Sequence, residues 1–175
     1  MEILLAKSAG FCFGVRRATQ MAFEAAAEHE HICSLGPVIH SPQVVKGLAE
    51  QGVKVVAEVE DIPPGSVIVR SHGVTAEEMD KIQKNNLTIV DATCPFVKKA
   101  QEYASRLSHE GYTVVIVGEL EHPEVQGIVS YSGDAVVHVV ADAVQAANLP
   151  RMNKVGIVAQ TTQLYENLKD IMDVC

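Results

Sequence analysis

The chain has 175 residues, of which 47% are apolar, and this is enough for one large domain or two small ones with a sizeable core. Aromatic residues make up only 5%, Trp is absent, and the net charge is −8, which argues against aromatic-lined nucleic-acid or sugar binding and against non-specific nucleic-acid binding. Neither a signal-peptide pattern nor an apolar run of bilayer length is visible, so we expect a cytoplasmic protein without a membrane partner.

Strands and helices are predicted to alternate along the sequence. Ser41, Pro42 and Gly52 have the residue types of a helix N-cap, first turn and stop, and Thr75 with Glu78 forms a capping box. The expected strands cover 3–6, 31–35, 53–56, 66–69, 87–90, 114–117, 135–140 and 155–158. The expected helices cover 15–28, 42–51, 76–84, 96–107, a short stretch after Pro123, 141–147 and 164–174.

This alternation predicts an α/β fold. Apolar β-branched strands between helices indicate mostly parallel sheets that are covered on both faces. The break that we favour lies at Cys94–Pro95. The prediction is therefore two similar small α/β domains, 1–94 and 95–175, each with a sheet of three or four strands.

Chemically capable side chains stand at six junctions that lead into helices. In open α/β sheets, ligands bind beyond the carboxyl ends of the strands. The six segments are GFCFG with Cys12, GPVIH with His40, RSHGVT with His72, DATCP with Cys94, GELEHPEVQG with His122 and Glu124, and AQTTQ with Gln160, Thr161 and Thr162. If the junctions face one another, one pocket combines two thiols, three imidazoles, a carboxylate and two hydroxyls.

Each position also has a purely structural interpretation. His40 precedes a helix N-cap, and Glu124 is a favourable charge in the first turn of a helix. Thr161 and Thr162 suit the cap of the last helix. The pocket hypothesis therefore depends on the six segments taken together.

The cysteines fall into two groups. Cys12 and Cys94 lie in loops that enter helices, where the positive potential favours a thiolate, and Gly10 and Gly14 let the backbone pass close to a bulky neighbour. This context indicates an iron–sulfur cluster, with zinc as the second possibility. The other two thiols are interpreted as structural: Cys33 in an apolar strand and Cys175 on the last helix.

Six motifs, in this order, resemble those of the 4-hydroxy-3-methylbut-2-enyl diphosphate reductase (LytB) family. They are GFCFGV, PVIHSPQVV, RSHGV, DATCP, HPEVQG and AQTT, and the resemblance runs along essentially the whole chain. It implies the terminal oxidoreductase of the methylerythritol phosphate route to isoprenoids. It also implies three α/β domains in a trefoil around a central cavity, a 4Fe–4S cluster held by three cysteines, and ferredoxin or flavodoxin as the electron donor.

The resemblance also implies roles for individual residues. Cys12 and Cys94 correspond to two cluster ligands, and Glu124 to the carboxyl group that delivers a proton. Thr161 corresponds to a hydroxyl beside the substrate alcohol. The groups that correspond to the binding site of the allylic diphosphate are His40, His72, His122 and, as a neighbour, Thr162.

The sequence departs from the family pattern in its last part. The segment with the third cysteine and the serine–asparagine segment of the diphosphate site are not found, and Cys175 follows Thr162 too closely to replace the third cysteine. We interpret the chain as the amino-terminal two of three domains. The alternatives are a third domain supplied by another chain, a non-catalytic module that binds zinc or phosphate, and a thiol redox protein that pairs Cys12 with Cys94.

Overall fold

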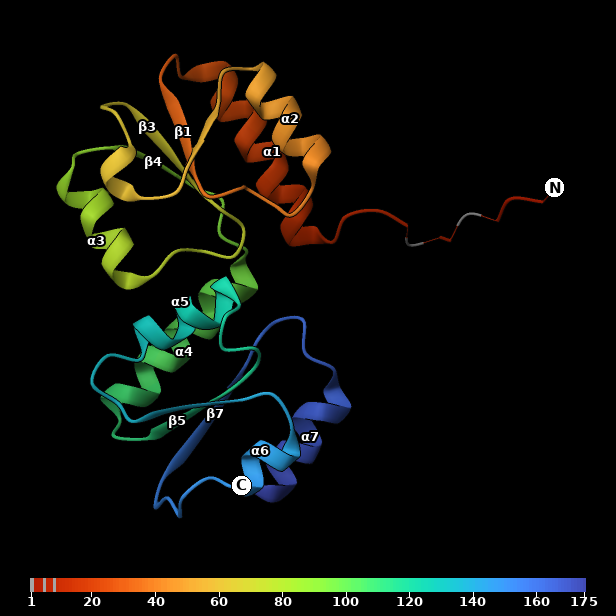
Figure 1. The fold of residues 1–175 in the computed structure, drawn as a ribbon, viewed down its shortest axis with the longest axis vertical. Coiled ribbons are helices and arrows are strands. Elements are labelled where there is room, and N and C mark those ends of the chain that lie inside the picture. Colours follow the sequence, from red (N-terminus) through yellow and green to blue (C-terminus); the bar gives the residue numbers. More distant parts are fainter. Residues whose placement is uncertain (1, 5, 8) are drawn as a thin grey trace.

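The computed structural model describes residues 2–4, 6–7 and 9–175. The chain folds into two α/β lobes, which lie one above the other in Figure 1. We call residues 13–91 the first lobe and residues 95–174 the second lobe, and the short loop 92–94 connects them. Each lobe contains its own sheet, so the site can draw residues from two sheet edges.

The first lobe holds a four-stranded parallel sheet with the order β2-β1-β3-β4. Its elements are α1 (Phe13–Glu28), β1 (Ile32–Leu35), α2 (Pro42–Glu50), β2 (Lys54–Val56), the 3-10 helix η1 (Val59–Asp61), β3 (Ser66–Val69), α3 (Ala76–Lys84) and β4 (Thr88–Asp91). Helices α1 and α2 cover one face around Ala22 and Ile68. Helix α3 and η1 cover the other face around Val67 and Ile82, so both faces are buried.

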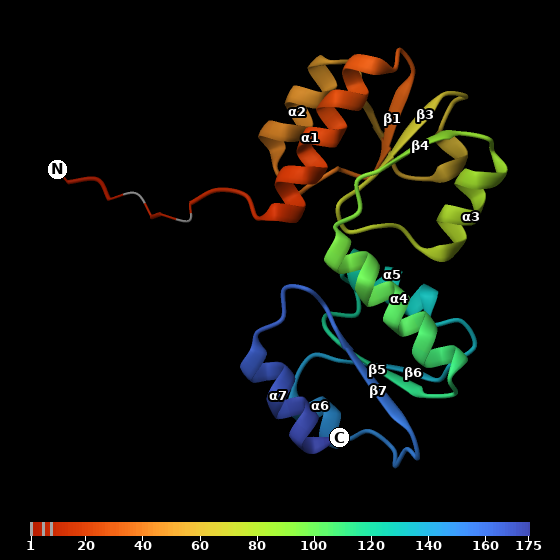
Figure 2. The ribbon, with the colours of Figure 1, turned by 180° about the vertical axis from the view of Figure 1, so that it is seen from behind.

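The second lobe holds a three-stranded parallel sheet with the order β6-β5-β7. Its elements are α4 (Pro95–His109), β5 (Thr113–Val117), α5 (Pro123–Tyr131), β6 (Val137–Val140), α6 (Ala143–Ala147), β7 (Val155–Ala159) and α7 (Tyr165–Val174). Helices α4 and α5 cover the face toward the first lobe, and α6 and α7 cover the opposite face (Figure 2).

The two parallel sheets confirm the predicted α/β fold with sheets of three or four strands. Each helix and strand predicted from residue 15 onward is present, and η1 was not predicted. The capping box forms, because Glu78 N–H donates to Thr75 Oγ1 and Thr75 N–H donates to the Glu78 carboxylate. The domain boundary at 94/95 and the three-domain trefoil stay predictions.

The predicted strand at 3–6 is wrong. Ile3, Leu4 and Ala6 form no strand and are exposed, and Leu5 lies outside the described residues. Figure 1 shows this amino-terminal segment leading away from the first lobe, where no described strand runs beside it. Apolar character favours a strand only where a neighbouring strand accepts its hydrogen bonds. Within the described ranges, no helix has the length and apolarity that a bilayer span requires.

Candidate functional site

Three histidines from both lobes form one cluster. His72 follows β3 and His122 follows β5, and their ring centroids lie 5.5 Å apart in an edge-on arrangement. His40 follows β1, and its ring centroid lies 4.8 Å from that of His72. The carboxyl edges of the two sheets therefore face each other, and we call these three side chains the histidine cluster.

His72, at the centre of the histidine cluster, is a neutral imidazole near pH 7. Burial lowers the pKa of His72 to about 4, and the nearby charges of His40, His122 and Arg70 act in the same direction. His122 Nδ1 accepts a hydrogen bond of 3.2 Å from the Glu124 N–H, which leaves Nε2 to carry the ring proton. The cluster therefore offers ring N–H donors to an anion.

Arg70 adds a positive charge that the sequence analysis did not include among the site residues. Its Nε donates to the Gly73 carbonyl at 3.2 Å, and Gly36 leaves room for its guanidinium, since a β-carbon there would lie 2.5 Å from Nη1. Gly36 has φ +69°, which also favours glycine. The position of Arg70 in the sequence could have indicated this role, because Arg70 directly follows β3 in the same segment as His72.

Glu124 is buried, and both of its carboxylate oxygens are bonded to Thr161. Oε1 accepts the Thr161 N–H at 2.6 Å, and Oε2 accepts the Thr161 hydroxyl at 2.9 Å. Glu124 comes from the first turn of α5 and Thr161 from the loop after β7, so the pair joins two strand ends of the second sheet. Two of the six segments therefore meet at these side chains.

Thr162 is placed differently from Thr161. Its hydroxyl accepts a hydrogen bond of 2.9 Å from Nε2 of the buried Gln160, while Gln160 Oε1 accepts the Glu119 N–H at 3.2 Å. Helix α7 has Leu164 as its N-cap, so neither threonine caps it. Gln160 thus holds the loop that presents Thr161 to Glu124.

Cys12 and Cys94 occupy equivalent positions in the two lobes, each as the N-cap residue of the helix that opens the lobe. The Cys94 sulfur lies close to the first turn of α1, which Cys12 precedes, because a β-carbon on Gly14 would be only 2.5 Å from it. Arg17 of α1 donates to the Thr93 carbonyl at 3.2 Å and ties this turn to the loop before Cys94. The bulky neighbour predicted for Gly14 is thus the Cys94 thiol.

Cys94 lies next to the loop that carries His72 of the histidine cluster. The Cys94 N–H donates to the Ser71 carbonyl at 2.9 Å, directly before His72. Cys12 is exposed and Cys94 is partly exposed, so a ligand can reach both thiols. Five of the six predicted segments follow strand ends as expected, and Cys12 is the exception because no strand is found in the described residues before it.

These two thiols fit an iron–sulfur cluster as two of its ligands. Cys33 is buried, burial raises the pKa of its thiol, and it is not a suitable ligand. Cys175 ends α7 and has no loop or glycine context. Among the described residues, no group of three His, Cys, Asp or Glu side chains could hold a metal ion, so this part of the chain supplies an incomplete ligand set.

Curated relatives match the chain over its whole length. It is 65% identical over 175 residues to a 4-hydroxy-3-methylbut-2-enyl diphosphate reductase of Syntrophotalea carbinolica, and 61% identical over 175 residues to one of Geobacter sulfurreducens. The chain spans 63% and 62% of these two proteins, respectively. It is thus homologous to the reductases, but it corresponds to an amino-terminal portion of them.

Solved structures show the same fold. One of (E)-4-hydroxy-3-methyl-but-2-enyl diphosphate reductase, the terminal enzyme of the non-mevalonate pathway, matches 98% of the chain with a TM-score of 0.81 and 41% identity. The chain covers 62% of that structure. The corresponding reductase of Plasmodium falciparum matches 96% of the chain with a TM-score of 0.88 and 26% identity, and the chain covers 54% of it.

The family model described as LytB protein matches residues 3–175. This match covers the first lobe, the second lobe and all eight residues that the sequence analysis assigned to the site. The chain therefore belongs to the LytB protein family.

Proposed function

We propose that this chain supplies part of the active site of a 4-hydroxy-3-methylbut-2-enyl diphosphate reductase. The reaction breaks the allylic C–O bond and forms a C–H bond, consumes two electrons and two protons, and releases water with isopentenyl or dimethylallyl diphosphate. The observation that carries the proposal is the buried Glu124 carboxylate bonded to Thr161 beside the histidine cluster. This arrangement supports the proposal because a carboxyl group that could deliver a proton lies next to imidazoles that could bind an anion.

The Glu124–Thr161 pair would deliver the proton that leaves with the hydroxyl group. A hydroxyl group can donate and accept at the same time. When Glu124 carries a proton, the Thr161 oxygen can accept it while its own hydrogen is donated to the substrate alcohol. Because Thr161 is exposed and Glu124 is buried, the threonine is the member of the pair that can touch the substrate.

The histidine cluster would bind the diphosphate group. His40, His72 and His122 present ring N–H donors from three different strand ends, and Arg70 adds a fixed positive charge beside His72. A polyanion at this position would favour protonation of His72, because it stabilises the charged form of the ring. Local charge thus allows an anion site in a chain whose net charge is −8.

Cys12 and Cys94 would hold the iron–sulfur cluster, with the third ligand supplied by the part of the family pattern that this sequence does not contain. When bound, the cluster would supply the electrons and an open iron for the substrate alcohol. Ferredoxin or flavodoxin is the donor class that the family resemblance implies.

Anaerobic cluster reconstitution tests this function. We expect the chain and its Cys175→Ser variant to retain iron and acid-labile sulfide, whereas Cys12→Ser and Cys94→Ser lose both. Cys175→Ser is the matched control, since it removes an exposed thiol at the far end of α7. Iron and sulfide retained equally by all four proteins would contradict the proposed role of these thiols.

A second candidate is a non-catalytic anion-binding module. One observation favours it: the histidine cluster is complete within this chain, whereas the cysteine set is not. This candidate predicts that inorganic pyrophosphate binds the protein without iron and that His72→Ala abolishes binding, while the chain retains no cluster. Cluster retention together with pyrophosphate binding would favour the reductase.

A further inference from the structure

Gln101 is a buried polar residue between the two lobes that the proposed function does not use. It lies on α4, and only 7% of it is exposed. Its Nε2 is buried and has no hydrogen-bond partner among the described residues. A buried donor without a partner lowers the stability of a fold. The amide at this position is therefore not explained by stability.

Two glycines make room for the end of the Gln101 side chain, one from each lobe. A β-carbon on Gly73, directly after His72, would lie 2.9 Å from Nε2, and one on Gly127 would lie 3.1 Å from it. Gly127 lies in α5, three residues after Glu124. Glycine inside a helix is less stable than alanine, and here it leaves the space beside the amide. The Gln101 side chain therefore separates the loop that carries His72 from the helix that carries Glu124.

The loop that carries His72 is a closed turn. The Gly73 N–H donates to the Arg70 carbonyl at 2.9 Å, and Arg70 Nε donates to the Gly73 carbonyl at 3.2 Å. His72 lies within this turn. Because the two ends of the turn are bonded to each other, a displacement of Gly73 moves the His72 ring with it.

A second contact holds the same part of the first lobe on α5. The Ser130 hydroxyl accepts the N–H of Ala76, the first residue of α3, at 3.0 Å and donates to the Gly127 carbonyl at 2.6 Å. It thereby satisfies a backbone N–H that has no partner within its own helix. Ser130 fixes where α3 meets α5, and Gln101 fixes the separation between α5 and the loop before α3.

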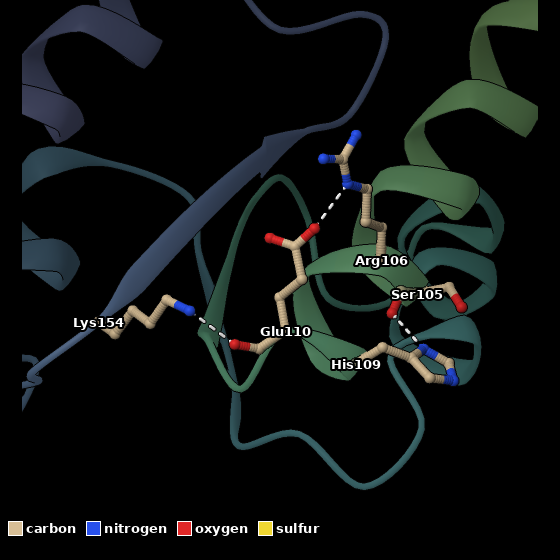
Figure 3. A network of polar contacts seen from close by, with 5 residues as sticks. All are labelled: Ser105, Arg106, His109, Glu110 and Lys154. Atoms are coloured by element: carbon tan, nitrogen blue, oxygen red, sulfur yellow. Dashed lines mark hydrogen bonds and ion pairs between the residues drawn. The ribbon is translucent and has the colours of Figure 1, made fainter.

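Helix α4, which carries Gln101, is fixed to the second lobe at its carboxyl end. Lys154, just before β7, donates to the Glu110 carbonyl at 2.6 Å (Figure 3). One turn earlier in α4, Leu107 lies so close to β7 that a β-carbon on Gly156 would be 2.5 Å from it. The helix is therefore a rigid base from which the Gln101 side chain reaches toward the first lobe.

We propose that Gln101 is a positioning residue of the candidate site, whose side chain sets the distance between the His72 loop and the Glu124 helix. The length of the side chain carries this role, since Nε2 has no hydrogen-bond partner in the described residues. The value of the spacing for the reaction rests on the proposed function, because it would hold an anion-binding ring and a proton-delivering carboxyl group at one separation. The spacing itself belongs to the fold and can be measured without substrate.

Replacement of Gln101 tests this inference by nuclear magnetic resonance at neutral pH. The ring protons of His72 and His122 should give a nuclear Overhauser effect across the lobes, since the ring centroids lie 5.5 Å apart and His122 is the N-cap of α5. Gln101→Ala removes the spacer and should weaken this effect. It should also weaken the binding of inorganic pyrophosphate about tenfold, because the rings no longer present their N–H groups together. Gln101→Met keeps the length of the side chain and should retain both.

Ala104→Gly is the control for an effect of stability alone. It weakens the same helix three residues later, where the side chain packs in the core of the second lobe, and should leave both measurements at the parent values. Equal losses in Gln101→Met and Gln101→Ala, or no loss in either, overturn the proposal. If the parent chain does not bind pyrophosphate, the anion site of the proposed function fails, while the Overhauser effect still decides the role of Gln101.

Gly127→Ala provides an independent second test. Its β-carbon would lie 3.1 Å from Nε2, so the amide must give way toward Gly73. We expect the Gly73 amide and His72 ring resonances to shift in this variant. They should shift much less when Gly127→Ala is added to Gln101→Ala, because the space is then empty. Equal shifts in both backgrounds would contradict the proposal.

Discussion

Glu124 lies in the first turn of α5, where a carboxylate stabilises a helix through its dipole, yet only 1% of the residue is exposed. A buried carboxylate is stable only when hydrogen bonds replace its hydration. Thr161 provides two of these bonds, one from its N–H and one from its hydroxyl. At this position one carboxylate suits the helix dipole and is also the group to which we assign the proposed site role.

The Thr161 hydroxyl should therefore contribute to stability as well as to the proposed chemistry. Thr161→Val keeps the shape but leaves Glu124 Oε2 without this donor, so the free energy of unfolding should fall by about 1–3 kcal/mol. Thr161→Ser keeps the hydroxyl and should lose much less. Urea denaturation followed by circular dichroism measures both, and equal losses would show that the hydroxyl contributes nothing.

Gly14 should act as a positioning residue for Cys94. A β-carbon at this position would lie 2.5 Å from the Cys94 sulfur, so Gly14→Ala must displace the thiol away from α1. We expect faster maleimide labelling of Cys94 and weaker retention of iron and sulfide. Gly47→Ala makes the same change in α2, where the nearest atom is a ring carbon of Phe23, and should leave Cys94 labelling at the parent rate.

At the scale of single elements, the two predicted N-caps turn out to differ. Thr75 caps α3 through its side chain, whereas Ser41 stands at the N-cap position of α2 and its hydroxyl donates to Gln43 Oε1 instead. Both residues have a side chain typical of an N-cap and stand directly before a predicted helix. The difference arises from the side-chain rotamer and its neighbours, which the sequence does not specify.

Replacement of the two caps should separate these cases. Thr75→Ala removes the acceptor of the Glu78 N–H and should lower the free energy of unfolding by about 1 kcal/mol. Ser41→Ala removes an exposed contact and should change it by less than about 0.5 kcal/mol. Chemical denaturation of both variants provides the comparison. A larger loss for Ser41→Ala would mean that its hydroxyl caps α2 in solution.

At the scale of the whole molecule, the opposition of the two sheet edges decides the protonation of His72. Burial between the lobes is the main cause that lowers its pKa to about 4, and the charges of His40, His122 and Arg70 act in the same direction. As the pH falls, His72 would take up a proton near pH 6.5 in the unfolded chain but only near pH 4 in the folded chain. His72 therefore contributes stability above about pH 6.5, and this contribution is lost as the pH falls toward 4.

A histidine titration checks this prediction. The ring proton resonances of His72 should show an inflection near pH 4 in the chain, and His122→Ala should raise it, because one of the neighbouring rings is removed. Saturating inorganic pyrophosphate should raise it further if the cluster is the anion site. An inflection near 6.5 in the parent chain would mean that the lobes do not enclose His72 in solution.

The sequence by itself determined the local structure of most of the chain. The alternation of β-branched runs and amphipathic helices, with Pro42, Gly52 and the Thr75 capping box as boundaries, is encoded within a few residues. These signals are strong because backbone conformation and local hydrogen bonds decide them. The same local motifs carried the site residues, because each lies directly beyond a strand or before a helix.

Only the tertiary structure decided which residues meet. The apolar run 3–6 has strand composition but no neighbouring strand among the described residues, so composition alone misassigned it. Arg70 became part of the site because its charge acts on His72 across space, and Gly14 became important because the Cys94 sulfur lies against it. Such contacts depend on how two sheets face each other, and residue patterns along one chain do not contain that geometry.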